Sequence, residues 1–310
     1  MNRFLEHCGA KYPIVQAPMG WIARSRLASA VCNAGGLGVI ETSSGETENC
    51  MAEIAKMKDL TDAPFGVNLP IMFLKDPAIL DHICGSGVKF VTTSAGSPRK
   101  FVGPLQEAGI IVYHAVPTVA AAMGCVEAGV DGLVVEGAEG GGFKNPEEVS
   151  TLVLLQAIRR QTDIPMIAAG GIADGKGMAA AFALGAEAIQ MGTRFVSSAE
   201  SPVHMNYKQA IIDAKETGTY VLNKKASPCI RALKTERTAK IYEDGLMPAD
   251  TFKGIQDVYF GGDMEASVGL AGQSSGLIDE VKTAKQIIDE TVAEFFKITE
   301  RMGALNAENF

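Results

Sequence analysis

Short apolar runs alternate with stretches of helical period over the first 195 residues. The runs are rich in Val and Ile and are too short for helices, whereas the stretches between them repeat their apolar residues every three to four positions. This alternation is typical of strands joined by crossover helices. The apolar runs lie at 14–19, 37–40, 65–68, 90–94, 111–116, 132–137, 165–171 and 188–195.

Eight such units in so short a segment predict an α/β fold in which the parallel strands close into a (β/α)8 TIM barrel. An open doubly wound sheet is the alternative architecture, because it uses the same βαβ units. We favour the barrel, since eight compact units suit closure better than an extended sheet.

The remaining third of the chain has a different pattern. A helix is expected over 205–217, and the segment 218–265 mixes basic and acidic residues without a long apolar run. Residues 283–303 form a clean amphipathic helical pattern. We therefore expect a barrel core over 1–217 and a small, mostly helical insertion over one barrel mouth at 218–265. The segment 266–310 would be a loop and a C-terminal helix that returns to the barrel.

Composition and charge narrow the functional classes. The chain has 310 residues, 47% of them hydrophobic, and a net charge of −8. It contains no basic stripe, which argues against nucleic acid, and no 18-residue apolar run or signal sequence, which argues against membranes. Six cysteines without a C-x-x-C motif and four dispersed histidines indicate reduced thiols, no metal site and a cytoplasmic location. We expect a small-molecule substrate; whether the chain forms a homodimer stays open.

Two glycine-rich strand ends predict a phosphate site. The seventh run ends in Gly170 and Gly171, and the eighth leads into Gly192 and Thr193. Loops after strands seven and eight form the usual phosphate cradle of a TIM barrel. The segment 170–176 also imitates an ATP-binding P-loop, but Gly177 stands where that motif needs Ser or Thr. The alternative to a phosphate site is a pair of tight turns without a ligand.

Other strand ends carry groups suited to a planar heterocycle. Ala17, Pro18 and Met19 end the first run with small, rigid backbone, Asn68 ends the third, and Gln273 follows a glycine loop. Amide side chains can both donate to and accept from a ring edge. With the phosphate cradle at the same mouth, these groups indicate flavin mononucleotide (FMN). FAD is disfavoured because no Rossmann fingerprint follows a strand.

Several motifs together resemble the nitronate monooxygenase (2-nitropropane dioxygenase) family, which includes the flavin-dependent enoyl-acyl-carrier-protein reductase called FabK. The resemblance runs nearly end to end and includes the segments 13–19, 34–38, 60–68, 136–142, 168–177, 191–195, 201–204 and 271–274. It implies non-covalent FMN surrounded by residues 17–19, Asn68, Gly171, Gly192 and Thr193, with Gln273 nearby. Glu136 would shape the glycine loop or accept from the ribityl chain.

The resemblance also raises a question about acid–base chemistry. In relatives the glycine run is followed by a histidine that acts as acid or base, whereas here Gly140–Gly142 leads into Phe143. A phenyl ring cannot exchange a proton. We expect Phe143 to be a wall of the substrate pocket instead. His114, at the end of the fifth run, is the histidine expected at the active mouth and is the candidate acid or base. The alternative is that His114 is a packed or hydrogen-bonded residue of the barrel.

The expected function is that of an FMN-dependent oxidoreductase similar to nitronate monooxygenase, which oxidises anionic alkyl nitronates with O2 without a protein base. A reductase of enoyl thioesters or quinones, with NADH or NADPH as co-substrate, is the alternative. A flavin-binding protein with little turnover is a second alternative.

Overall fold

A computed structural model describes residues 2–305 of the chain. Eight parallel strands form one sheet in the order β1-β9-β8-β6-β5-β4-β3-β2. The end strands meet through a parallel bridge between Val15 and Leu37, so the sheet closes on itself. The Gln16 side chain assists this closure, since Nε2 donates to the Val39 carbonyl over 3.2 Å. The prediction of a (β/α)8 barrel is confirmed.

Each barrel strand overlaps one apolar run of the sequence. The strands are β1 (Ile14–Gln16), β2 (Val39–Ile40), β3 (Gly66–Pro70), β4 (Phe90–Ser94), β5 (Ile111–Val116), β6 (Gly132–Glu136), β8 (Met166–Ala169) and β9 (Ala188–Met191). Helices α2 (Ser25–Asn33), α3 (Thr47–Leu60), α4 (Ala78–Gly85), α5 (Arg99–Glu107), α6 (Val119–Glu127), α7 (Thr151–Arg159) and α8 (Gly175–Ala183) connect them. Side chains of Thr118, Ser150 and Asp174 cap α6, α7 and α8 by accepting from free backbone N–H groups.

The barrel strands are buried on both faces. Val15, Phe90, Tyr113 and Val134 pack together in the interior, while their sequence neighbours pack against the helices. Successive side chains of a strand point to opposite faces. Membership of these two clusters therefore shows which side of the sheet each strand residue occupies.

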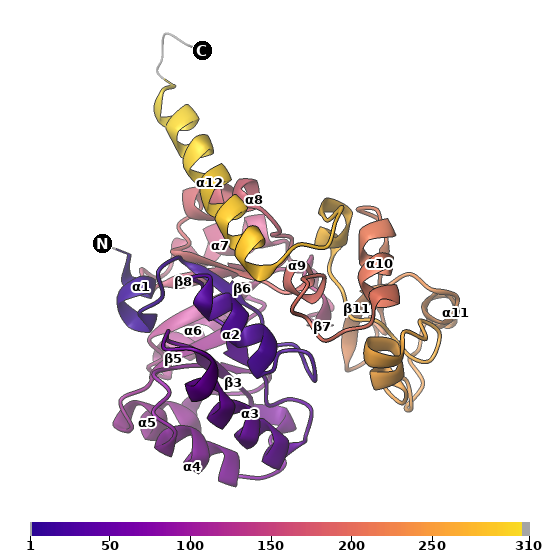
Figure 1. Ribbon diagram of the computed structural model, residues 1–310, viewed down its shortest axis with the longest axis horizontal. Helices are drawn as coiled ribbons and strands as arrows, with labels where there is room; N and C mark the ends of the chain where they lie inside the picture. Colours follow the sequence, from indigo (N-terminus) through magenta and orange to yellow (C-terminus); the bar gives the residue numbers. More distant parts are fainter. Residues whose placement is uncertain (1, 306–310) are drawn as a thin grey trace.

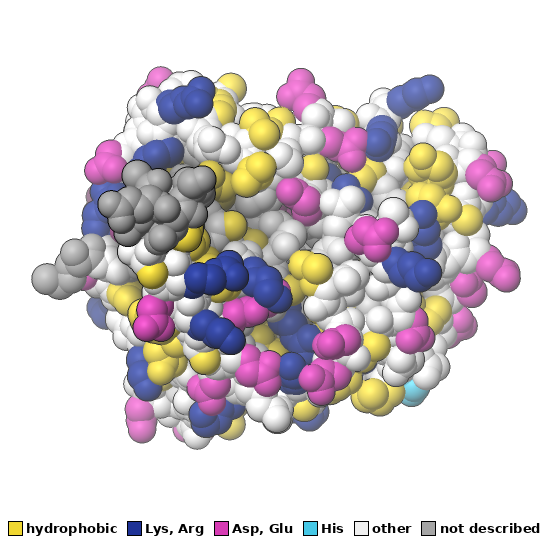
Figure 2. Space-filling view, turned by 90° about the horizontal axis from the view of Figure 1, so that it is seen from above, with side chains coloured by type: hydrophobic (Ala, Val, Ile, Leu, Met, Phe, Trp, Pro, Cys, Tyr) yellow, Lys and Arg dark blue, Asp and Glu magenta, His cyan; other side chains and the backbone are white. Residues whose placement is uncertain are grey.

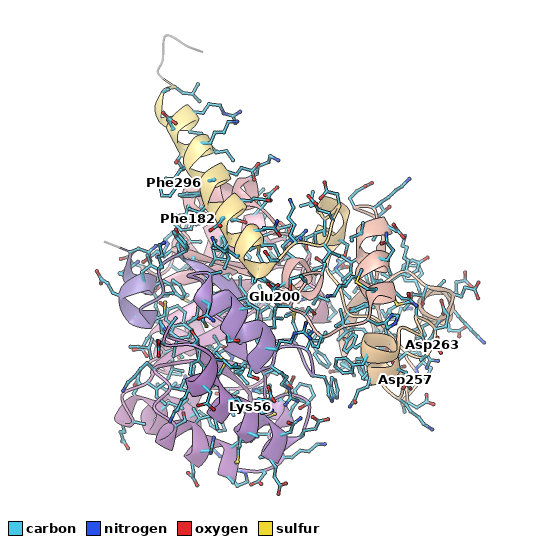
Figure 3. All side chains as sticks on the ribbon, in the orientation of Figure 1. Lys56, Phe182, Glu200, Asp257, Asp263 and Phe296 are labelled. Atoms are coloured by element: carbon cyan, nitrogen blue, oxygen red, sulfur yellow. The ribbon has the colours of Figure 1, made fainter. Side chains whose placement is uncertain are left out.

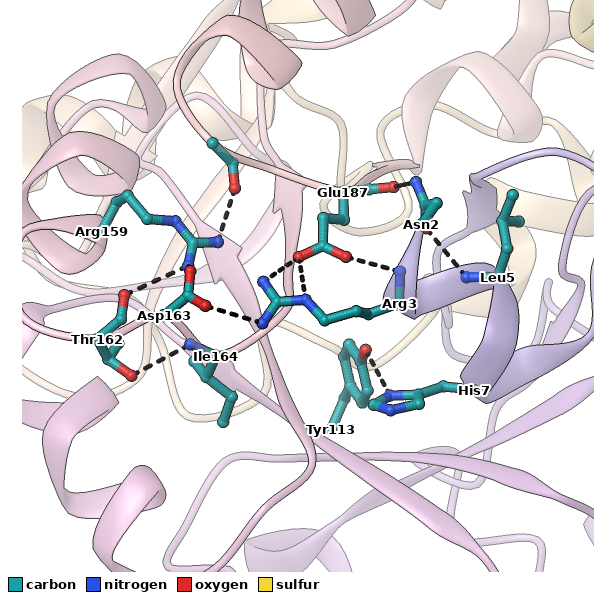
Figure 4. Close-up of polar contacts among 11 residues, drawn as sticks. Asn2, Arg3, Leu5, His7, Tyr113, Arg159, Thr162, Asp163, Ile164 and Glu187 are labelled. Carbon is teal, nitrogen blue, oxygen red and sulfur yellow. Dashed lines mark hydrogen bonds and ion pairs between the residues drawn. The ribbon is translucent and has the colours of Figure 1, made fainter.

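Helix α1 (Arg3–Cys8) closes the amino-terminal pole of the barrel. Phe4 inserts its ring against Phe90 and Tyr113, at centroid distances of 5.7 and 6.2 Å. Arg3 bonds Asp163 and Glu187, and His7 bonds the Tyr113 hydroxyl at 3.0 Å (Figure 4). This pole is filled and cross-linked, so a ligand site belongs at the carboxyl ends of the strands.

The cap, residues 218–265, lies on the side of the barrel opposite α1 (Figure 1). The expectation of a mostly helical segment needs one correction. Besides α11 (Glu236–Asp244) and the π-helical turn η2 (Asp257–Gly261), the cap contains β10 (Thr219–Leu222) and β11 (Cys229–Leu233). β10 pairs with β11, and β11 also pairs with β7 (Gly142–Lys144), which comes from the loop after β6. The pairing partner is distant in sequence, so local pattern does not indicate this sheet.

The last part of the chain returns to the barrel. Helices α9 (Thr193–Val196) and α10 (Met205–Asp213) and the short helix η3 (Gln273–Leu277) lead to α12 (Ala284–Gly303), whose amino end carries a capping box of Thr283 and Gln286. Phe295 of α12 packs its ring against Phe182 of α8 at 5.1 Å, in the region where Figure 3 labels Phe182 and Phe296.

The surface is mixed in charge. Acidic and basic side chains are interspersed over the face shown in Figure 2. Over residues 2–305, no helix has the length and apolar character needed to cross a bilayer.

Candidate functional site

Polar side chains face the barrel interior at the carboxyl ends of β6 and β9. Val134 and Ala188 belong to the interior cluster, so Glu136 and Gln190, two residues further along each strand, share that face. Gln190 Oε1 is buried and has no hydrogen-bond partner among the described residues. Buried acceptors are normally paired, so this oxygen suits a donor on a bound molecule. Sequence reasoning missed Gln190; its signal is a polar residue in an apolar run, two positions after an interior residue.

The loops after β1 and β9 meet at Gly192. Ala17 N–H donates to the Met191 carbonyl over 3.0 Å. A Cβ placed on Gly192 would lie 3.6 Å from Ala17 Cβ and 3.9 Å from Met19 Sδ. The structure therefore brings the expected ring platform at 17–19 next to the expected phosphate loop.

Thr193 connects the phosphate loop to the loop that carries Gln273. Its Oγ1 accepts from the Gly272 N–H over 2.9 Å, and Gln273 N–H donates to the Glu139 carbonyl over 2.9 Å. Gly170 and Gly171 have φ of +97° and +75°, conformations that favour glycine. A Cβ on Gly171 would lie 3.3 Å from Glu139 Cβ, so the loops after β6, β8 and β9 and the 271–273 loop converge.

Asn68 faces the interior from β3 and is held in one orientation. Its Nδ2 donates to the Thr92 carbonyl and hydroxyl, both over 3.0 Å, and to Ser94 Oγ over 3.3 Å. The amide nitrogen is thus committed to β4. No hydrogen bond within residues 2–305 occupies Oδ1, which leaves this oxygen as an acceptor for a ligand.

The glycine run at 140–142 lets two segments approach closely. A Cβ on Gly140 would lie 2.7 Å from Glu136 Oε1 and 3.0 Å from Lys144 Nζ. A Cβ on Gly141 would lie 2.6 Å from the carbonyl carbon of Ala271. Real Cβ atoms do not come so close to backbone. The first glycine makes room for an ion pair, and the second lets the loop lie against the 271–272 backbone.

That ion pair joins Lys144 to Glu136. The Lys144 side chain is only 3% exposed, whereas that of Glu136 is 31% exposed. The sequence placed Glu136 near the cofactor and left two alternatives for Lys144, which were to reach the site or, as is commoner for a loop lysine, to face water.

Phe143 carries a half-exposed ring at the same loop. The side chain is 46% exposed and stands between two other rings, Phe73 at 5.2 Å and Phe252 at 5.9 Å between centroids. Phe73 ends the short helix η1 (Ile71–Phe73) after β3, and Phe252 belongs to the cap. We call these three residues the aromatic trio.

His114 does not face the barrel interior. Val112 and Val116 pack against the helices and Tyr113 packs inside, so His114 lies on the helix side of β5. It is buried, and its Nδ1 bonds Thr93 Oγ1 at 2.7 Å. Burial lowers the pKa of His114 to about 4. The structure therefore does not bring the candidate acid or base to the mouth, and His114 is a neutral, packed residue.

The groups present at the mouth fit FMN. Gln190 and Asn68 offer free acceptors to the N–H and O–H groups of a ribityl flavin. Gly192 and Thr193 begin α9, so the backbone N–H groups there have no partner within the helix and suit an anion. Ala17 and Gly192, which directly follow β1 and β9, are both small.

Comparisons with known proteins identify the family of the chain. The family model for nitronate monooxygenase matches residues 2–83 and 76–294. The chain is 30% identical to (3aS,4S,5R,7aS)-5-hydroxy-7a-methyl-1-oxo-octahydro-1H-indene-4-carboxyl-CoA dehydrogenase of Rhodococcus jostii, covering 97% of this chain and 98% of that protein. It is also 30% identical to nitronate monooxygenase of Pseudomonas aeruginosa, covering 92% and 96%.

Two solved structures are similar in fold and sequence. FabK from Thermotoga maritima has a TM-score of 0.93 and 38% identity, covering 97% of this chain and 98% of that chain. Nitroalkane oxidase from Streptomyces ansochromogenes has a TM-score of 0.85 and 26% identity, covering 96% and 99%.

Proposed function

Because the chain belongs to the nitronate monooxygenase family of oxidoreductases, we propose that it is an FMN-dependent reductase of apolar α,β-unsaturated acyl thioesters. NADH or NADPH would supply the electrons. The likeness to FabK and to a dehydrogenase named for an acyl-CoA supports a thioester substrate.

The observation that carries the proposal is the aromatic trio. Three rings from three separate segments meet beside the glycine run, and two of them, Phe73 and Phe143, remain 37% and 46% exposed. Exposed apolar groups gathered at a site mark a binding surface for an apolar ligand. An acyl chain suits this surface, whereas a small nitronate anion would gain little from it.

Bound FMN would supply hydride transfer, which is the chemistry of the cofactor itself. The protein would bind the phosphate of FMN through backbone N–H groups at Gly171, Gly192 and Thr193. Asn68 and Gln190 would accept hydrogen bonds from the ring edge and the ribityl chain. Phe143 would border the flavin ring and support the acyl chain.

Reduction of the double bond also requires one proton at the α-carbon. Phe143 cannot give it, His114 faces the helices, and Lys144 is engaged by Glu136. We assign this proton to water at the mouth. Oxidation of preformed nitronates with O2 is a second candidate function, favoured by the family match and by the lack of a base at Phe143, since an anionic nitronate needs no deprotonation.

A two-stage experiment tests the proposal. The purified flavin-loaded protein is mixed anaerobically with NADH or NADPH, and the loss of flavin colour is followed. Oxygen-free 2-enoyl-CoA thioesters of increasing chain length are then added. We expect fast bleaching and a return of colour that is faster for longer chains.

Other results would redirect the assignment. Slow bleaching with rapid O2 uptake on ethyl nitronate would favour the monooxygenase. No response in either assay would favour a flavin-binding protein with little turnover.

A further inference from the structure

A second hollow lies away from the aromatic trio, between the barrel and the cap. It is a cavity of about 350 Å³. The barrel side comes from the loop after β1 and the starts of α2 and α3, and the cap side from η2 and the residue before it. Figure 3 labels Lys56 on α3 and Asp257 on η2, the elements that border it. The lining includes Trp21, Arg24, Arg26, Glu46, Gln256 and Phe260.

The cavity combines two aromatic rings with an unpaired cation. Phe260 is 39% exposed, and Trp21 is partly exposed on the opposite wall. Arg26 is exposed, and its guanidinium makes no ion pair or hydrogen bond with residues 2–305. Aromatic faces stack on bases, and guanidinium groups bind phosphate through paired N–H donors.

The other charged groups of the lining are already engaged. Arg24 bonds the carboxylates of Glu41 at 2.7 Å and Glu46 at 3.1 Å, yet its Nε and Nη1 have no partner among described residues. Glu53 accepts from Ser25 and pairs with Lys56. Arg26 is therefore the cation left for an anion, while the Gln256 amide can accept from sugar hydroxyls.

One wall of the cavity is close in sequence to the expected flavin mouth. Trp21 follows two residues after Met19, which borders Gly192. Trp21 N–H donates to Glu41 Oε1 over 3.1 Å, so this wall is held in place. A long ligand could keep its reactive end at the mouth and its other end in the cavity.

We propose that this cavity binds a phosphorylated adenosine, the end that NADPH and CoA thioesters have in common. The adenine would stack between Trp21 and Phe260, and a ribose phosphate would bind Arg26. The inference rests on the proposed function for the identity of the long ligand, but adenosine phosphates can test it without turnover.

The test is calorimetric binding to the purified flavoprotein. The probes are adenosine 2′,5′-bisphosphate, which represents NADPH, adenosine 3′,5′-bisphosphate, which represents CoA, and unphosphorylated adenosine. The variants are Arg26→Ala and Phe260→Ala. Arg99→Ala is the matched control, because Arg99 is an exposed arginine on α5 and does not line the cavity. Thermal unfolding shows that each variant is folded.

We expect at least one bisphosphate to bind, and Arg26→Ala and Phe260→Ala each to weaken it at least tenfold while Arg99→Ala leaves it unchanged. Tighter binding of the 2′,5′-bisphosphate would identify NADPH as the natural ligand, and tighter binding of the 3′,5′-bisphosphate would identify a CoA thioester. Three results would overturn the inference. Adenosine could bind as tightly as both bisphosphates, the wild-type protein could bind neither bisphosphate, or both variants could bind with wild-type affinity. These outcomes are independent of thioester turnover, so failure of the proposed reaction is distinguished from failure of this site.

Discussion

The ammonium group of Lys144 bonds the carboxylate of Glu136, eight residues earlier in the chain. Glu136 ends a barrel strand, whereas Lys144 belongs to β7, which pairs with the cap strand β11. Arg231 of β11 adds a second connection, because its Nε donates to the Ala138 carbonyl over 2.8 Å. The cap is thus attached to the barrel beside Phe143.

Replacing Lys144 by methionine should destabilise the protein. Breaking a buried ion pair costs about 3–5 kcal/mol, and solvent access to the partner reduces this to about 1–3 kcal/mol here. Urea unfolding measures the loss. Lys285→Met is the control, since Lys285 is 71% exposed and should change stability by less than about 0.5 kcal/mol. A double variant with Glu136→Gln should recover part of the loss; equal stability of Lys144→Met and wild type would contradict the pairing.

Phe143→His should preserve the fold and add a base. The native ring is 46% exposed, so we expect a stability change below about 1 kcal/mol, far less than a buried phenyl would cost. Activity on neutral nitroalkanes should appear and rise with pH through about 6.5, because the neutral imidazole is the base. Phe296→His, on α12, is the control and should gain nothing. A folded Phe143→His without nitroalkane turnover at any pH would mean that this position is not aimed at the flavin.

His114 should make stability depend on pH without serving catalysis. Burial lowers its folded pKa to about 4, below the unfolded value of about 6.5. The unfolded state therefore binds more protons between these values, and stability is fully present above about pH 6.5 and lost as pH falls toward 4. The loss should approach about 3 kcal/mol. Urea midpoints of wild type and His114→Gln across this pH range measure the loss of stability. If His114 is only structural, the rate at which the folded His114→Gln protein reduces its substrate at pH 8 should remain within about twofold of the wild-type rate.

Gly192→Glu should fold but release the flavin. Its Cβ would meet only ordinary contacts at Ala17 and Met19, so the backbone tolerates a side chain. A carboxylate there would repel the phosphate dianion by several kcal/mol, an order-of-magnitude expectation for like charges in a shielded site. Flavin absorbance after desalting measures retention. Gly103→Glu, where a Cβ meets nothing within 4 Å, should stay yellow. A yellow Gly192→Glu protein would locate the phosphate elsewhere.

The strands and crossover helices of the barrel are determined by local pattern. Eight buried runs at regular spacing can pair only as parallel strands with crossover helices, and glycines mark the turns where the backbone needs positive φ. The capping box and apolar stripe of α12 are likewise local signals. For these reasons the strands, the final helix and the glycine loops could be predicted from the sequence.

Orientation and long-range pairing were decided only by the tertiary structure. Barrel strands are apolar on both faces, so alternation does not reveal which parity points inward; this is why His114 was expected at the mouth and Gln190 was missed. The β7–β11 pairing and the Lys144–Glu136 bond join segments whose local sequences carry no mutual signal. The aromatic trio and the cavity between the barrel and the cap likewise form only where loops from distant strands meet the cap. Tertiary folding, and not local sequence, brings those side chains into contact.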